Sequence, residues 1–235
     1  MNNPQSTIRN PQFLWIIRHG ESIGNVARHS AERQNALQIE TPHREPDVPL
    51  SELGKAQAQK LGKWFSTPNQ KPTIIYTSPY IRAMETTQIL VESAGFERDE
   101  VLIRLDERLR ERELGVFDCL TKEGARLKYP DLCDLRERWG KFYFRPPGGE
   151  SWADVVFRLR SFIETDFSKL HKENVLIVTH EVVVRCFRYI LEYLNEPEIL
   201  AIDAASDVEN GAITSYEFDA ERNKFTLKLD NYLPK

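Results

Sequence analysis

The chain contains 235 residues, of which 40% are hydrophobic, so it is long enough for one α/β domain with a sizeable core. Its 32 Lys and Arg residues against 36 Asp and Glu residues give a net charge of −4, which provides no overall positive field for nucleic acid or an anionic membrane. Residues 1–12 are polar and no apolar run approaches the roughly 18 residues that cross a bilayer, so we expect neither a signal peptide nor a membrane span. The three cysteines lack CxxC spacing, so we expect neither a disulfide framework nor a zinc site. Together these features favour a cytoplasmic protein.

Short apolar runs rich in β-branched and aromatic residues predict strands that are buried on both faces of a sheet. The first run covers residues 13–17, and similar runs follow at 73–77, 101–103 and 175–179. Two later runs, 213–218 and 224–230, flank a polar turn and predict an antiparallel hairpin at the edge of the sheet.

Amphipathic helical patterns separate the earlier runs and cover residues 51–66, 79–94 and 151–170. The last pattern begins with Ser151 and Asp154, whose spacing predicts a capping box. Strands that alternate with such helices are typical of a three-layer α/β/α fold around a mainly parallel, doubly wound sheet.

Two segments, residues 27–49 and 115–149, have weak periodicity and a polar, proline-containing composition. Long excursions of this kind inside a compact domain are often functional. We expect them to be helical insertions over the sheet edge that holds the site, within a single domain that covers residues 1–235.

The motif Arg18-His19-Gly20-Glu21-Ser22 directly follows the first predicted strand, with Asn25 in the next turn. In an open parallel sheet, ligands bind outside the carboxyl ends of the strands, where this motif falls. Gly20 lacks side-chain bulk and is expected to let backbone approach a ligand. Alone, an Arg-His-Gly tripeptide is better explained as a solvated surface turn, so the prediction of a site depends on other polar groups in the same layer.

The segment Ser78-Pro79-Tyr80-Ile81-Arg82 follows the run at residues 73–77. Ser78 is expected to cap a helix, with Pro79 at its first position. Arg82 then falls in the first turn, where the positive end of the helix disfavours a cation unless an anion lies nearby. A surface ion pair between Arg82 and Glu85 or another acidic residue is the alternative.

His180 closes the run at residues 175–179 and therefore also falls at a carboxyl end. Alone, such a histidine is as well explained by a satisfied position in the core. With His19, Asn25 and the two arginines it supplies many hydrogen-bond donors and little negative charge, which is what a tetrahedral phosphate requires. The sequence therefore predicts a phosphate pocket at this edge of the sheet.

Further motifs continue through nearly the whole chain in a specific order and spacing. They are Arg18-His19-Gly20-Glu21-Ser22 with Asn25, Pro49-Leu50-Ser51-Glu52-Leu53-Gly54, Ser78-Pro79-Tyr80-Ile81-Arg82-Ala83, Leu109-Arg110-Glu111-Arg112-Glu113-Leu114-Gly115, Pro147-Gly148-Gly149-Glu150-Ser151 and Val178-Thr179-His180. In these motifs the chain resembles the histidine phosphatase superfamily, also called the phosphoglycerate-mutase-like superfamily.

The resemblance implies that His19 is a nucleophile that becomes phosphohistidine. Its attacking nitrogen must be unprotonated, and we expect local backbone to hold the other ring nitrogen. The residues expected to bind the phosphate or the substrate are Arg18, Ser22, Asn25, Arg82 and His180. No metal or cofactor is needed for this chemistry.

The family's proton donor falls on Glu111, within charged residues 106–113 that would otherwise be interpreted as a solvated face. Glu107 and Glu113 are the alternatives for this role. One departure from the family is Glu181, because the residue after the second histidine is commonly small. A carboxylate there is expected to raise the pKa of His180 or to repel part of a phosphate.

Three other functions remain to be compared with a phosphatase that hydrolyses a small phosphorylated substrate. A metal-dependent hydrolase with His19, His180 and Glu111 as ligands is disfavoured by the two arginines and by the lack of HxH or HExxH spacing. A noncatalytic phospho-ligand-binding module on the same fold is also possible in principle, although the catalytic set is complete.

A phosphoglycerate mutase is the third alternative, since Lys122 resembles the substrate-facing lysine of the mutases. Against it, residues 143–151 lack the long insertion that those mutases carry, so the sequence favours a phosphatase. A homodimer is compatible with the sequence.

Overall fold

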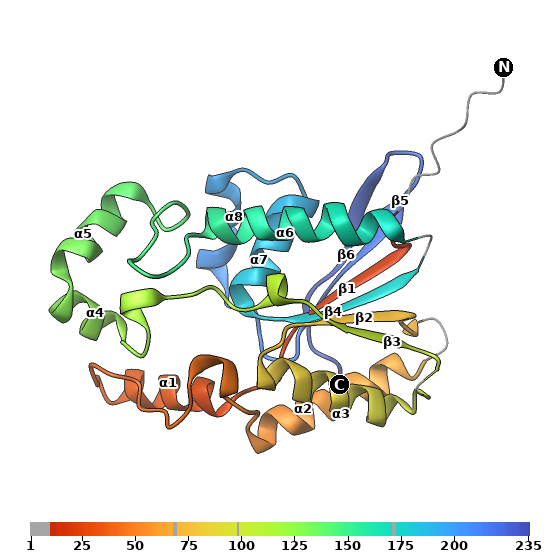
Figure 1. The fold of residues 1–235 in the computed structure, drawn as a ribbon, viewed down its shortest axis with the longest axis horizontal. Coiled ribbons are helices and arrows are strands. Elements are labelled where there is room, and N and C mark those ends of the chain that lie inside the picture. Colours follow the sequence, from red (N-terminus) through yellow and green to blue (C-terminus); the bar gives the residue numbers. More distant parts are fainter. Residues whose placement is uncertain (1–9, 68–69, 98, 171–172) are drawn as a thin grey trace.

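The computed structural model describes residues 10–67, 70–97, 99–170 and 173–235 (Figure 1), so residues 1–9 of the polar N-terminal segment lie outside it. Its centre is a six-stranded sheet in the order β3-β2-β4-β1-β5-β6. The strands are β1 (Phe13–Arg18), β2 (Ile74–Thr77), β3 (Leu102–Leu105), β4 (Asn174–Thr179), β5 (Ile213–Asp219) and β6 (Lys224–Tyr232). β1 to β4 run parallel, whereas β5 pairs antiparallel with β1 and β6, which confirms the predicted mainly parallel sheet with an antiparallel edge.

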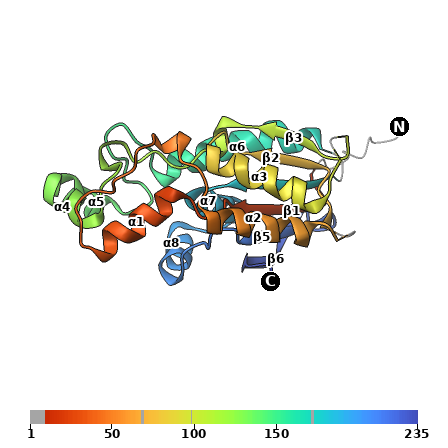
Figure 2. The same cartoon turned by 90° about the horizontal axis from the view of Figure 1, so that it is seen from below.

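The side chains of β1 alternate between two cores, one on each face of the sheet. Leu14 and Ile16 pack against α6 (Trp152–Asp166) and α7 (Glu181–Leu191), while Trp15 and Ile17 pack against α2 (Glu52–Phe65) and α3 (Ile81–Ala94). Figures 1 and 2 show these two helix pairs on opposite faces of the sheet. A strand between two apolar layers has a continuous apolar sequence, which is why β1 was recognisable.

The edge strand β3 departs from the predicted burial. Its four side chains are exposed, because β3 is the outer strand of the sheet and only β2 pairs with it among the described residues. At the opposite edge, β6 alternates exposed and half-buried side chains, as expected for a strand with one covered face.

Helix α3 begins two residues later than predicted. Its N-cap is Tyr80, which makes no side-chain capping bond, so the prediction that Ser78 caps this helix is wrong. The Ser78 hydroxyl instead contacts His180 Nε2 at 2.7 Å. In α6 the predicted capping box is present, since Ser151 and Asp154 each bond the other's backbone N–H.

Helices α7 and α8 (Glu196–Ala205) were not predicted from the sequence. Val182, Val183 and Val184 open α7, and β-branched residues have low helix propensity. Val183 and Val184 are buried in the core against α6, so tertiary packing outweighs the local preference.

The two predicted insertions contribute α1 (Ile23–Arg33), α4 (Lys122–Lys128) and α5 (Pro130–Trp139). Figures 1 and 2 both show these helices together at one end of the molecule, beyond the carboxyl ends of the parallel strands. Backbone bonds connect the insertions, from Ile39 N to Cys119 O at 2.8 Å and from Thr121 N to Leu37 O at 3.2 Å. None of the helices among the described residues has the length and apolar character to cross a membrane.

Candidate active site

His19 lies directly after β1 and is 3% exposed. Its Nδ1 is 2.6 Å from the carbonyl oxygen of Gly20, and Arg82 Nε donates to its Nε2 at 3.1 Å. A carbonyl only accepts and a guanidinium only donates, so the ring is neutral with its proton on Nδ1. Nδ1 is thus held by local backbone, and Nε2 is unprotonated, with its lone pair accepting from Arg82.

Gly20 has a different role from the one expected. A Cβ at this position would overlap with the carbonyl oxygen of Gly54, and one at Gly54 would overlap with the carbonyl oxygen of Glu21. The two glycines therefore allow the segment after β1 to pack directly on the start of α2, where Ser51 Oγ donates to the Glu21 carboxylate at 2.6 Å. Gly20 fixes the backbone behind His19 and does not provide space for a ligand.

Arg82 lies in the first turn of α3, as predicted, and is 4% exposed. Besides His19, it donates to Glu45, from Nη1 to the carbonyl oxygen and from Nη2 to the carboxylate, each at 2.7 Å. Its alternative partner Glu85 accepts instead from Leu50 N at 2.7 Å. Glu45 thus supplies the anion that a cation at a helix N-terminus requires.

His180 lies between β4 and α7 and is fully buried. Its ring packs edge-on against that of His19, with 5.1 Å between centroids. Nε2 contacts Ser78 Oγ, which accepts from Tyr80 N at 3.3 Å, and Nδ1 has no hydrogen-bond partner among the described residues. The Ser78 hydroxyl can donate to Nε2 or accept from it, so this contact fits a ring proton on either nitrogen of His180.

Arg18 and Glu181 form an ion pair, with 3.1 Å between Nη1 and Oε2. Burial raises the pKa of Glu181 despite the opposing charge of Arg18, and the nearby Glu111 carboxylate contributes to the increase. The pKa of His180 is lowered rather than raised, chiefly by burial and then by Arg82. The expectation that Glu181 raises the pKa of His180 is therefore wrong, because burial and the positive charge of Arg82 lower this pKa.

Ser22 and Asn25 form the capping box of α1. The Asn25 Oδ1 accepts from Ser22 N at 3.0 Å and from Asn210 Nδ2 at 3.4 Å, which leaves the amide nitrogen of Asn25 without a partner among the described residues. Both residues line the same cavity as His19, so the N-terminus of α1 lies at this cavity. A helix N-terminus favours a bound anion through its backbone N–H groups and dipole.

Glu111 lies in the segment after β3, and its carboxylate accepts from Arg112 N at 2.8 Å. The nearly buried Arg158 of α6 holds this segment by donating to the carbonyl oxygens of Arg110 at 2.9 Å and Glu111 at 3.4 Å. Of the three candidate carboxylates, Glu111 alone lines the cavity that contains His19. Glu113 accepts from the Tyr80 hydroxyl at 3.0 Å.

The shared cavity has a volume of about 80 Å³. Of the seven residues predicted for the site, it is lined by Arg18, His19, Ser22, Asn25, Arg82 and Glu111. His180 does not line it but lies against His19. The residues from β1, α1, α3 and the segment after β3 are therefore brought together as expected, with the carboxylates of Glu45 and Glu181 among them.

A family model described as histidine phosphatase superfamily (branch 1) matches residues 14–231. The chain belongs to the histidine phosphatase superfamily. It is 32% identical over 198 residues to the 2,3-bisphosphoglycerate-dependent phosphoglycerate mutase of Rhizobium meliloti (strain 1021), a match that covers 83% of this chain and 86% of the mutase.

Solved structures give the same assignment of fold. Bacillus stearothermophilus YhfR is 27% identical, with a TM-score of 0.73 over 93% of this chain and 96% of that one. A mycobacterial glucosyl-3-phosphoglycerate phosphatase is 23% identical, with a TM-score of 0.67 over 95% of this chain and 100% of that one. The superfamily consists of phosphoryl-transfer enzymes, and the relatives of this chain are named both as mutases and as phosphatases.

Three residues of this histidine phosphatase site were not found from the sequence. Glu45 binds Arg82, Asn210 Nδ2 donates to the His19 carbonyl oxygen at 3.1 Å, and Arg158 holds the Glu111 segment. Glu45 begins a short 3₁₀ helix and Asn210 lies in a turn, neither of which has a recognisable sequence pattern. Arg158 lies on an amphipathic helix, where a cation is usually solvated. The one available signal was the position of Arg158 on the apolar stripe of α6, where a solvated cation is not expected.

Because His19 is buried and neutral, the free energy of unfolding is expected to decrease in acid. Burial, followed by Arg82 and Arg18, holds the pKa of His19 well below its usual value. Below about pH 6.5 an unfolded histidine gains a proton while the folded one does not, so the free energy of unfolding falls as pH decreases through this range. Replacing His19 by Gln should reduce the total fall between pH 7 and pH 5.5 by about 1 kcal/mol, measured by urea unfolding, because a difference of one bound proton gives at most about 1.4 kcal/mol per pH unit. Equal slopes for both proteins would contradict a neutral His19.

Proposed function

We propose that the chain is a metal-independent phosphatase that hydrolyses a phosphate monoester through a phosphohistidine on His19. The observation that carries this proposal is the pair of contacts to the His19 ring, because Nδ1 is held by the Gly20 carbonyl oxygen and Nε2 accepts from Arg82 and is therefore unprotonated. A neutral imidazole with one nitrogen held in place is a competent nucleophile for phosphorus. The lowered pKa of His19 keeps it neutral in mild acid.

Phosphate binding would use the donors around the cavity. Arg18, Arg82 and His180 would balance the charge on the non-bridging oxygens, with the side-chain amide nitrogen of Asn25 beside them. The carbonyl oxygen and the carboxylate of Glu45 each accept from Arg82. A phosphate bound to Arg82 would lie close to this carboxylate and repel it, so we expect the Glu45 carboxylate to leave Arg82 when a phosphate binds.

The reaction follows as two in-line displacements at phosphorus. Nε2 of His19 forms the P–N bond while the P–O ester bond breaks, and Glu111 gives its proton to the leaving alkoxide. Glu111 then takes a proton from water, whose oxygen bonds to phosphorus as the P–N bond breaks. His19 returns to its neutral form and phosphate departs.

Metal removal is expected to leave the rate unchanged. Arginine and histidine donors would balance the phosphate charge in this scheme, so no step requires a divalent ion. Hydrolysis of an aryl phosphate should be equal before and after dialysis against EDTA. Loss of activity that one divalent metal restores would revive the metal-hydrolase alternative.

Phosphoglycerate mutase activity is the second candidate function, and one observation favours it. Next to the His19 cavity, a second cavity of about 270 Å³ is lined by Glu111 and by the cations Arg112, Lys122 and Arg136, together with Lys141, which pairs with Asp203. Such cations suit a substrate with a second acidic group, as in phosphoglycerate. The relative from Rhizobium meliloti also carries the name of a mutase.

Phosphatase and mutase differ in the molecule that accepts the phosphoryl group from phosphohistidine, which is water in one and the substrate in the other. Incubation with either phosphoglycerate isomer, followed by ³¹P NMR, measures interconversion and phosphate release in one sample. For a phosphatase, phosphate release should match or exceed interconversion. Interconversion that greatly exceeds release would identify a mutase, and no saturable turnover of any monoester would indicate a noncatalytic binding module.

A further inference from the structure

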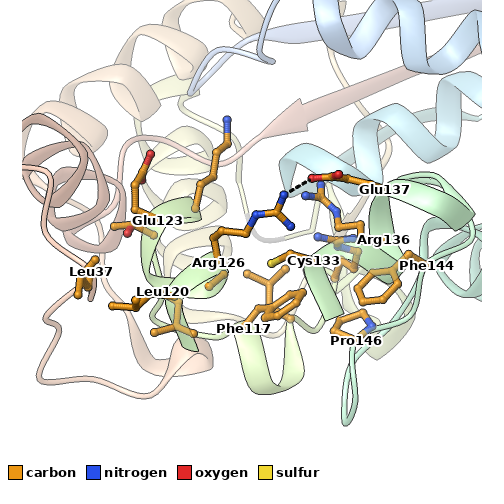
Figure 3. A pocket seen from close by; sticks show the side chains of 16 residues that line it. Leu37, Phe117, Leu120, Glu123, Arg126, Cys133, Arg136, Glu137, Phe144 and Pro146 are labelled. Carbon is orange, nitrogen blue, oxygen red and sulfur yellow. Dashed lines mark hydrogen bonds and ion pairs between the residues drawn. The ribbon is translucent and has the colours of Figure 1, made fainter. Parts of the chain in front are cut away.

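A groove of about 840 Å³ lies between α4, α5 and the loop that precedes α4 (Figure 3). This volume is within the range of about 300–1,000 Å³ typical of sites for organic ligands. Its apolar walls include Leu37, Phe117, Leu120, Phe144 and Pro146. Figure 3 shows Leu37 and Leu120 toward one side, Phe144 and Pro146 toward the other, and Phe117 between them.

The groove combines apolar walls with a polar rim. Phe117 and Phe144 stack with 6.0 Å between ring centroids, which gives the groove an aromatic wall. At the rim, Arg126 is neutralised by ion pairs with Asp134 at 2.5 Å and Glu137 at 3.0 Å, the second of which is drawn in Figure 3. Arg112, Lys122 and Arg136 also line the groove, so it joins apolar walls to a cationic side, and the apolar walls are the part that a hydrocarbon can cover.

Shared residues connect the groove to the site of phosphoryl transfer. Leu114 and Leu120 line both the groove and the cavity that contains His19. Arg112 and Lys122 line both the groove and the second cavity, in which Glu111 also lies. The groove therefore adjoins both cavities, and a leaving group whose ester oxygen is near Glu111 lies next to it.

We propose that the substrate is the phosphate monoester of an alcohol with an apolar body, and that this body binds in the groove while the phosphate lies at His19. This inference rests on the proposed phosphatase function and specifies its substrate class. Leu37 remains 44% exposed in the free protein, and so it offers apolar surface that a ligand can cover. An unbranched chain is sufficient to test the groove, because apolar burial does not depend on direction.

The test uses ethyl, butyl and hexyl phosphate, each below its critical micelle concentration. Their leaving alkoxides have nearly the same basicity, so the chemical step is constant while the apolar surface grows. Burial of one methylene group corresponds to about a fourfold gain in binding. We expect kcat/KM to rise between about twofold and fourfold for each added methylene group.

Two matched variants locate this gain. Leu37→Asn places a polar side chain on the groove wall and should lower the ratio of the hexyl to the ethyl kcat/KM by about fivefold or more. Leu53→Asn is the control, because Leu53 is 55% exposed on α2 and lines none of the three cavities. It should leave the ratio at the wild-type value.

The outcomes separate this inference from the function on which it rests. Equal kcat/KM for the three esters, or an equal ratio in Leu37→Asn and the wild type, would overturn the groove as the leaving-group site while the phosphatase function stands. If none of the three esters releases phosphate, and an activated aryl phosphate is also not hydrolysed, the proposed function itself fails.

Discussion

Replacing His19 by alanine is expected to lower kcat for phosphate monoester hydrolysis by on the order of 10⁵-fold, the scale on which loss of a covalent nucleophile acts. The remaining donors can still bind phosphate, but without Nε2 no atom in the cavity is placed to form the P–N bond. Single-turnover and steady-state rates with an activated aryl phosphate measure the loss.

The matched control is His29→Ala, because His29 is exposed on α1 and lines none of the three cavities. Its rate should remain within about twofold of the wild-type rate. A His19→Ala protein that is folded by circular dichroism and hydrolyses the ester at a rate near that of the wild type would refute the assignment of the nucleophile.

The second large effect concerns Glu111 and depends on the leaving group. For an alkyl phosphate, Glu111→Gln should lower the rate of phosphoryl transfer to His19 by on the order of 10² to 10⁴, the usual contribution of a positioned general acid. An activated aryl phosphate needs little protonation of its leaving oxygen, so the same step should be far less affected. Rapid release of phenol followed by slow turnover is then expected, since Glu111 also activates water.

Glu107→Gln provides the control for Glu111→Gln. Glu107 is exposed and lines none of the three cavities, so both esters should react at wild-type rates. Equal losses for the alkyl and aryl esters in single-turnover experiments with Glu111→Gln would show that Glu111 is not the acid. A leaving-group-dependent loss in Glu113→Gln would transfer the role to that residue.

The elements that the sequence made predictable are those whose local pattern agrees with their packing. β1 has an uninterrupted apolar run because helices cover both of its faces, and Ser151 with Asp154 predicts the start of α6 because a capping box is a local interaction. Helix α7 was not predicted, because its valines favour a strand locally and their burial against α6 outweighs this preference.

The site was predictable where its residues follow strands. His19 and His180 lie at the carboxyl ends of two paired parallel strands, β1 and β4, so sheet topology alone brings them together. Glu45 reaches the site from a short 3₁₀ helix and Asn210 from a turn, and the position of both depends on packing that has no local signature. Ser78 was assigned to a cap because its spacing fitted one, although its hydroxyl instead orients His180.

The most direct test of the central claim is to trap the intermediate. Enzyme mixed with ³²P-labelled aryl phosphate is quenched within milliseconds in alkali, where phosphohistidine survives, and its peptides are mapped by mass spectrometry. One phosphoryl group on the peptide that contains His19, absent in the His19→Ala protein, is the predicted result. Label on a different residue, or phosphate release with no labelled enzyme at any time, would contradict a phosphohistidine mechanism.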